Sequence, residues 1–136
     1  MKYLLDTNID SDARRGAATP VDGWVSARPV GDLAISSITL MELEVDARRK
    51  EGADPAAGAH LRRWLDDHVL PILAGRILPV DAGVAVECAR LHVPDPMPDV
   101  DALTAATALA HGLTLVTRNT KDFLRTGAAL LNPREP

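Results

Sequence analysis

The sequence predicts an α/β fold in which helices cover both faces of a parallel sheet. Short apolar runs alternate along the chain with longer helical patterns, as in βαβ units. The runs Tyr3–Leu5 and Leu33–Ser36 are continuously apolar or nearly so, which is typical of strands buried on both faces. The chain has 136 residues and shows no internal repeat or linker, so one domain spanning residues 1–136 is expected.

A sheet of four to five strands is expected. In chain order the strands are expected at residues 3–5, 33–36, 77–80 and 113–117, with 128–131 as the fifth. Pro79 lies within the third run and indicates an edge strand, because proline cannot donate a hydrogen bond to a central ladder.

Helices are expected between these strands. Their predicted ranges are 8–15, 22–28, 38–50, 56–69, 81–92, 99–111 and a short helix within 118–124. In the third of them, Met41 and Val45 are expected on the same face as Ile38. Pro71 is expected to end or kink the helix before it. Gly112 is expected to end the helix that precedes it.

Composition and charge exclude several classes of protein. The net charge of -4 argues against general coating of nucleic acid, for which a basic face is expected, but a nuclease with clustered acids remains compatible. Cys88 is the only cysteine, so no intramolecular disulfide can form and a reducing, cytoplasmic location is expected. No signal peptide is expected, and no apolar run approaches the roughly 18 residues of a membrane span.

Four acidic residues stand where elements of this fold begin or end. Asp6 follows the first strand, Glu42 lies in an early turn of a helix, Asp101 lies in a first turn, and Asp122 follows the fourth strand. In α/β sheets, ligands bind beyond the carboxyl ends of the strands. Two such charges about 4 Å apart would repel by roughly 4 kcal/mol at an effective dielectric near 20. A hard cation such as Mg²⁺ or Mn²⁺, which prefers oxygen ligands, would remove that cost.

Each acid also has a purely structural interpretation. Asp6 and Asp122 would each cap the short helix that follows or contains them. Thr39 and Glu42 fit a capping box, in which Glu42 would reach back to an unpaired N–H. Asp101 would be stabilised in its first turn by the helix dipole. The basic run at residues 48–50 is likewise expected to be solvated at the end of its helix.

Other catalytic chemistries have little support in the sequence. The four histidines form no HExxH pattern and no zinc-ligand cluster with cysteine. The chain has no glycine-rich phosphate loop and no GxSxG elbow.

Five segments, taken together, resemble the PIN-domain ribonucleases. They are YLLDTN at 3–8, ISSITLME at 35–42, GRILPVD at 75–81, DALTAATALA at 101–110 and LVTRNTKDF at 115–123. Their order and spacing are similar to those of the VapC-type toxins of bacterial toxin–antitoxin pairs, in the branch similar to FitB. The resemblance covers essentially the whole chain, through LLNP at 130–133.

This resemblance implies a PIN-like three-layer α/β/α fold and a function. It assigns Asp6, Glu42, Asp101 and Asp122 to a catalytic Mg²⁺ or Mn²⁺ site, and Asn8, Thr117 and Asn119 to polar groups that orient the ligands or the substrate. It implies metal-dependent cleavage of RNA and inhibition of translation. It further implies neutralisation by a cognate VapB-type antitoxin, a homodimer within the toxin–antitoxin complex, and no membrane partner. Contacts to RNA phosphates are assigned to Arg14, Arg15, Arg118 or Lys121.

Two positions depart from the pattern, and two other functions remain open. Asp10 and Asp99 stand where relatives usually carry apolar residues, although Asp99 would also serve as the cap of its helix. One alternative is a phosphatase with Asp6 as covalent nucleophile. Asn8 counts against it, because such sites favour a second aspartate at that position. The other alternative is a catalytically inactive PIN-fold binding module, which loss of a matched acid would have favoured.

Overall fold

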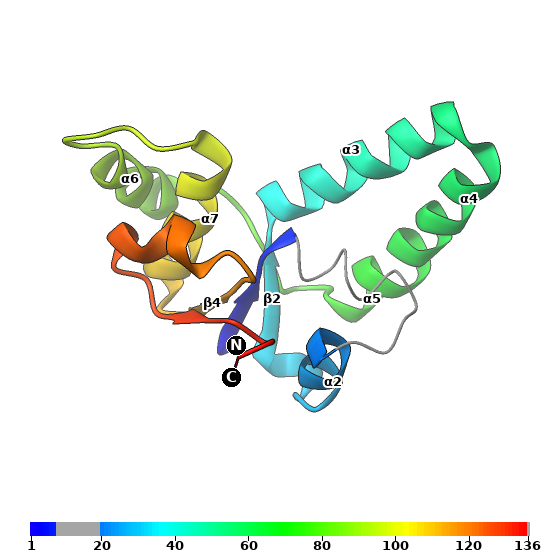
Figure 1. The fold of residues 1–136 in the computed structure, drawn as a ribbon, viewed down its shortest axis with the longest axis horizontal. Coiled ribbons are helices and arrows are strands. Elements are labelled where there is room, and N and C mark those ends of the chain that lie inside the picture. Colours follow the sequence, from blue (N-terminus) through cyan, green and yellow to red (C-terminus); the bar gives the residue numbers. More distant parts are fainter. Residues whose placement is uncertain (8–19, 136) are drawn as a thin grey trace.

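The computed structural model describes residues 1–7 and 20–135 of the chain (Figure 1). Five parallel strands form one sheet in the order β3-β2-β1-β4-β5. The strands are β1 (Tyr3–Leu5), β2 (Leu33–Ser36), β3 (Ile77–Leu78), β4 (Thr114–Val116) and β5 (Leu130–Leu131). The α/β class and the edge position of the strand before Pro79 are therefore confirmed. The helix expected at 8–15, with Asn8, Asp10, Arg14 and Arg15, falls outside the described residues.

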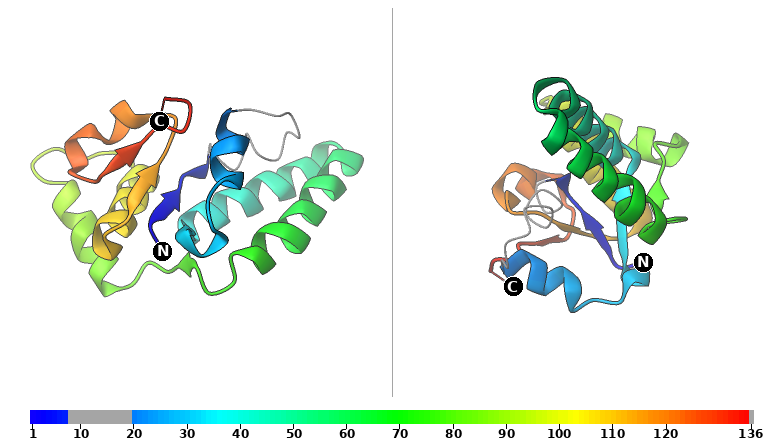
Figure 2. Two further views of the ribbon diagram at one scale, coloured as in Figure 1. Left: turned by 90° about the horizontal axis from the view of Figure 1, so that it is seen from below. Right: turned by 90° about the vertical axis from the view of Figure 1, so that its right-hand side faces the viewer.

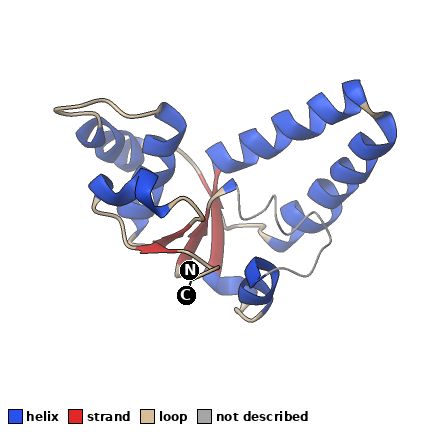
Figure 3. Cartoon of the chain, viewed as in Figure 1, coloured by secondary structure: helices blue, strands red, loops and turns tan. Residues whose placement is uncertain are grey.

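Helices cover both faces of the sheet, as the apolar strands predict (Figures 1 and 3). On one face lie α6 (Ala82–Leu91) and α7 (Asp99–His111). On the other lie α2 (Pro20–Ser26) and the hairpin of α3 (Ser37–Ala53) and α4 (Pro55–Trp64), and the left view of Figure 2 shows the same separation. Neighbouring residues of β1 alternate between the two cores: Leu4 packs with the α6–α7 layer and Leu5 with the α3–α4 layer.

The helix starts are fixed by local capping. Ser36 accepts a hydrogen bond from the Thr39 N–H at 3.0 Å, and it therefore starts α3 directly after β2. Asp54 and Asp81 cap α4 and α6 in the same way. Gly112 ends α7 with a φ of 65°, as expected from its position.

The face of α3 that packs on the core is not the one that carries Met41 and Val45. Met41 and Val45 are 48% and 37% exposed, whereas Leu43 and Ala47 are buried in the core. The same spacing of four residues occurs in both pairs, and the buried stripe also contains the polar Thr39. The helix also runs to Ala53, so Asp54 alone separates it from α4 and the basic run at 48–50 does not end it.

The helix expected at 56–69 contains a change of pitch. After α4, residues Leu65–Val69 form a π-helical turn, and α5 (Leu70–Ile72) ends one residue past Pro71. Val69 is buried in this turn and His68 is exposed. A short 3₁₀ helix, η3 (Thr120–Thr126), follows β4 near the expected place. No helix in the described part of the chain has the length and apolar character needed to cross a bilayer.

Candidate active site

Asp6 is held at the carboxyl edge of the sheet by its own backbone and side chain. Its N–H donates to the carbonyl of Val116 at 3.0 Å, which continues the pairing of β1 and β4 by one residue. Thr117 follows β4 at the same level and donates from Oγ1 to Asp6 Oδ2 at 2.9 Å. The Thr7 N–H donates to the other oxygen, Oδ1, also at 2.9 Å. Both carboxylate oxygens of Asp6 therefore have a fixed direction.

Glu42 is linked to Asp6 through Thr7. Thr7 Oγ1 donates a hydrogen bond to Glu42 Oε1, while its N–H holds Asp6. Ser36 is the residue that caps α3, and Thr39 lies one turn inside the helix with a buried side chain. The capping-box interpretation of Thr39 and Glu42 is therefore wrong. The Glu42 carboxylate accepts a hydrogen bond from Thr7, just beyond β1, and does not cap its own helix.

Asp101 lies in the first turn of α7 with a half-buried side chain. The residue at the cap position is Pro98, and no side chain caps this helix. The interpretation of Asp99 as the cap is therefore wrong: its side chain is 90% exposed and lies 3.4 Å from His92 Nε2. Of the two acids in this turn, Asp101 is therefore the one whose charge interacts with those of Asp6 and Asp122.

Asn119 and Asp122 lie in the loop and short helix beyond β4. The Asn119 N–H donates to Thr117 Oγ1 at 3.1 Å, and the Asp122 N–H donates to the Asn119 carbonyl at 3.1 Å. Asp122 makes no side-chain cap in η3 and is exposed. The two Thr117 hydrogen bonds therefore connect the loop that carries Asp122 to Asp6.

The carboxylates interact electrostatically across the site. Burial, opposed by the hydrogen bonds from Thr117 and Thr7, raises the pKa of Asp6, and the charge of Asp122 acts in the same direction. Burial also raises the pKa of Asp101, with further contributions from Asp6 and Asp122.

Glu42 responds to the same charges. Burial raises its pKa against the hydrogen bond from Thr7, and Asp6, Asp46 and Asp101 raise it further. The positive charge of Arg118 has the opposite effect on Asp6. The site is thus a cluster of acids that favours bound positive charge.

The donor set suits a hard divalent cation, although the carboxylates are not gathered into a tight shell. Within residues 1–7 and 20–135, no three acidic, histidine or cysteine side chains form a ready metal-binding group. Mg²⁺ keeps several of its waters and needs only one or two direct carboxylates, so acids that do not form one tight shell can still hold it through water. The assignment of the four acids as metal ligands stays a prediction.

The structure adds residues that the sequence did not single out. Thr7 bridges Asp6 and Glu42, and Asp46 contributes charge next to Glu42. In the sequence, only its place next to Asp6 in the segment YLLDTN pointed to a role for Thr7. Asp46 lies one turn after Glu42 on α3, a spacing that places two side chains on one helix face.

The fold and this site define a class of protein: a parallel α/β sheet whose carboxyl edge carries acids from several elements. The PIN domain family matches residues 3–129, and the chain belongs to that family. A relative named VapC ribonuclease Y4jK, from Sinorhizobium fredii, is 33% identical, with 98% of both chains covered. Toxin FitB of Neisseria gonorrhoeae is 34% identical, with 96% of both chains covered.

Solved structures show the same architecture over the whole chain. The crystal structure of FitAcB from Neisseria gonorrhoeae matches with a TM-score of 0.89 at 32% identity, over 96% of this chain and 97% of that one. A toxin–antitoxin complex from Klebsiella pneumoniae matches with a TM-score of 0.76 at 29% identity, over 99% of this chain and all of that one (100%). The PIN-like three-layer fold is therefore shown.

Proposed function

We propose that this chain is the toxin of a toxin–antitoxin pair and that it hydrolyses phosphodiester bonds in RNA with Mg²⁺ or Mn²⁺. The observation that carries the proposal is the hydrogen-bonded network through Thr7 and Thr117, which joins Asp6 to Glu42 and to the loop that carries Asp122. The charge of Asp101 acts on Glu42 beside this network. Four separate elements contribute acids to one edge of the sheet, where the fold binds ligands. Helix capping does not account for Glu42, because Ser36 caps α3.

Each residue has a distinct part in the proposed reaction. Asp6 and Asp101 would be the main ligands of the cation, with Glu42 and Asp122 completing the site directly or through water. When bound, the cation would lower the pKa of a coordinated water and stabilise charge on the phosphate oxygens. Thr7 and Thr117 hold the carboxylates of Asp6 and Glu42 in place before any ligand arrives. Either Glu42 or Asp122 would accept the proton of the attacking water.

The relatives favour this reaction over the two alternatives. One full-length relative is named a ribonuclease and another a toxin. An inactive binding module would have no reason to keep four coupled acids. A phosphatase with Asp6 as nucleophile would favour a second aspartate two positions later, where this chain has Asn8.

The proposed partner is a cognate VapB-type antitoxin, and the proposed complex contains a homodimer of this chain. The Klebsiella pneumoniae structure is named as a toxin–antitoxin complex, and its chain matches this one over its full length. Co-expression with the gene next to it, followed by light scattering of the purified complex, would give the partner and the stoichiometry.

The direct experiment is cleavage of labelled RNA by the purified chain. Cleavage that needs Mg²⁺ or Mn²⁺, stops in EDTA and is lost in Asp6→Asn supports the proposal. Trapping of a phosphorylated Asp6 with a phosphate-ester substrate would instead support the phosphatase. Sequencing of RNA ends after a brief pulse of expression would identify the target.

A further inference from the structure

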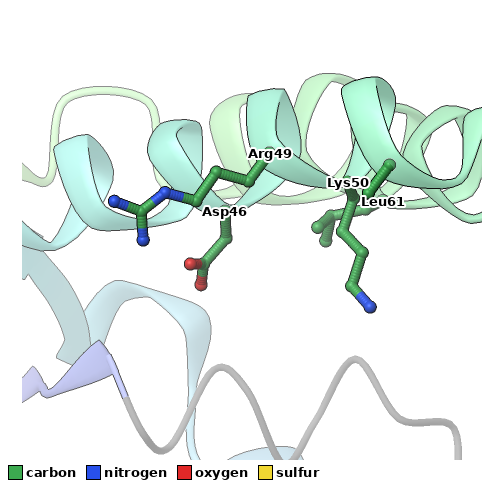
Figure 4. A pocket seen from close by; sticks show the side chains of 5 residues that line it. Asp46, Arg49, Lys50 and Leu61 are labelled. Atoms are coloured by element: carbon green, nitrogen blue, oxygen red, sulfur yellow. The ribbon is translucent and has the colours of Figure 1, made fainter.

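A cavity of about 330 Å³ lies beside α3 (Figure 4). Its lining residues are Asp46, Arg49, Lys50, Ala53 and Leu61. In Figure 4 Asp46 and Lys50 extend to the same side of the helix, and the guanidinium of Arg49 extends along α3 toward the end of β1. Leu61 is a core residue of α4, so the α3–α4 hairpin forms the wall of the cavity.

The two helices of the α3–α4 hairpin pack closely, and this packing makes the wall of the cavity rigid. A Cβ atom on Gly58 would lie 2.4 Å from the backbone of Glu51, so only glycine permits this approach of the two helices. Arg62 of α4 forms ion pairs with Glu44 at 2.8 Å and Glu51 at 3.0 Å of α3. The α3–α4 packing therefore fixes the helix backbone from which Arg49 and Lys50 extend.

The cavity adjoins the candidate active site along one face of α3. Asp46 is one turn after Glu42 and contributes to its raised pKa, so the two carboxylates are electrostatic neighbours. Arg49 and Lys50 follow at i+7 and i+8 from Glu42, which places them roughly 10–12 Å further along the axis at 1.5 Å per residue. This face of α3 therefore changes from acidic at the sheet to basic beyond it.

The two cavity cations differ from the other basic residues of the hairpin. Arg48 pairs with Glu44 at 3.5 Å, and Arg62 pairs with Glu44, Glu51 and Asp66. Among the residues that the structure describes, Arg49 and Lys50 form no ion pair, and both are exposed. Within residues 1–7 and 20–135, neither charge is therefore taken up by an ion pair.

We propose that Arg49 and Lys50 form a subsite for a backbone phosphate of single-stranded RNA, away from the bond that is cut. The proposal rests on the proposed ribonuclease function, because it takes the scissile phosphate to lie at the acids. A stacked strand advances about 3.4 Å per nucleotide, so the subsite would hold a phosphate roughly three nucleotides away. A guanidinium and an ammonium group each suit a phosphate, and Arg49 and Lys50 line the same cavity. The acids, in contrast, would accept RNA only with a cation present.

The subsite also predicts that the protein recognises RNA mainly through its backbone. Contacts to phosphate position a strand without reading its bases. The chain has few aromatic residues for stacking, at 3% of the sequence, so backbone contacts would contribute much of the affinity.

The test compares two double variants that remove the same charge from the same hairpin. Arg49→Gln/Lys50→Gln changes the cavity, and Arg48→Gln/Arg63→Gln changes exposed positions outside it. Both are made in the full chain with Glu42→Gln, which is expected to slow cleavage by about 10²-fold during the measurement while the main metal ligands, Asp6 and Asp101, are kept. Fluorescence anisotropy in Mg²⁺ then follows binding of a labelled 12-nucleotide single-stranded RNA across a range of salt, and a labelled dinucleotide serves as the short ligand.

The expected result is about tenfold weaker binding of the 12-nucleotide RNA by the cavity variant alone, with a salt slope smaller by about 0.7 to 1. The dinucleotide should bind both variants alike. Equal binding of the long RNA by both double variants would overturn the subsite, as would failure of the parent protein to bind RNA. A binding difference without any RNA cleavage by the unmodified chain would leave the subsite standing and reject the ribonuclease function.

Discussion

Thr117 Oγ1 donates a 2.9 Å hydrogen bond to Asp6 Oδ2, although 111 positions separate the two residues in the chain. The contact exists because β1 and β4 are adjacent parallel strands whose carboxyl ends meet, with Leu5 opposite Val116. The same hydroxyl accepts from the Asn119 N–H at 3.1 Å. Thr117 therefore orients the central carboxylate and holds the loop that carries Asp122.

Replacing Thr117 with valine should reduce both stability and cleavage. The change keeps the shape but leaves the Asn119 N–H and an Asp6 oxygen without this partner, which costs about 1–3 kcal/mol. Cleavage should fall roughly ten- to a hundredfold because Asp6 loses a fixed orientation. Thr107→Val is the matched control, since its buried hydroxyl bonds only to the Leu103 carbonyl within α7. If both variants keep equal activity per folded molecule, Thr117 has no role in positioning.

Variants of Glu42 and Ser36 test separately what α3 contributes to cleavage and what it contributes to stability. Glu42→Gln should lower cleavage by on the order of 10²-fold with little change in unfolding free energy, because Glu42 does not cap the helix. Ser36→Ala should show the reverse pattern, losing about 1 kcal/mol of stability as a lost N-cap while the folded protein stays active. Unfolding in urea and RNA cleavage, measured on both variants, test this pair. Full activity in Glu42→Gln would contradict the assigned role.

Replacing Asp101 with asparagine should stabilise the metal-free protein at neutral pH. The folded state raises the pKa of Asp101 above its ordinary value of 3.8, so the ionised carboxyl destabilises the fold. This penalty is absent well below pH 3.8 and complete once the pH exceeds the raised value. The stability difference between wild type and Asp101→Asn in EDTA should therefore shrink as the pH falls from 7 toward 4. Asp99→Asn, at a 90% exposed side chain, serves as control and should show a smaller difference.

The antitoxin should inhibit by placing an arginine or lysine side chain among the acids. A guanidinium fork suits paired carboxylates, and the net charge of -4 favours a basic segment. Binding should weaken as salt rises, and Asp6→Asn and Asp122→Asn should weaken it further. Calorimetric titration of the purified pair measures both effects. Wild-type affinity in both variants at every salt concentration would mean that inhibition acts elsewhere, for example by blocking RNA entry.

Much of the fold follows from local sequence features. The bounds of β1, β2 and α7 agree with the predicted ranges, because continuous apolar runs and a glycine stop are strong local signals. The buried face of α3 was not predictable, since its core contacts include Thr39 and Ala47, whose hydropathy does not mark a face. The π turn at Leu65–Val69 was not predicted either, because no local sequence pattern indicates it.

Part of the candidate site could likewise be predicted from the sequence, and part could not. The four acids could be predicted from the segments that resemble the PIN-domain family. Their places at the ends of predicted elements also indicated the carboxyl edge of the sheet. The Thr7–Glu42 hydrogen bond joins residues 35 positions apart and depends on where Ser36 starts α3, so it needed the structure. The cavity beside Arg49 and Lys50 likewise depends on the close α3–α4 packing at Gly58.

The most direct test of the central claim is a Mg²⁺ titration of RNA cleavage and thermal stability by wild type, Asp6→Asn and Asp101→Asn. The account predicts that wild-type cleavage is absent in EDTA and rises with Mg²⁺. Bound metal should stabilise the wild type by about 2.7 kcal/mol at a hundred times its Kd, and both variants should lose the cleavage and most of this gain. Undiminished cleavage by either variant at matched Mg²⁺, or wild-type cleavage that persists in EDTA, would contradict a metal centre built on these carboxylates.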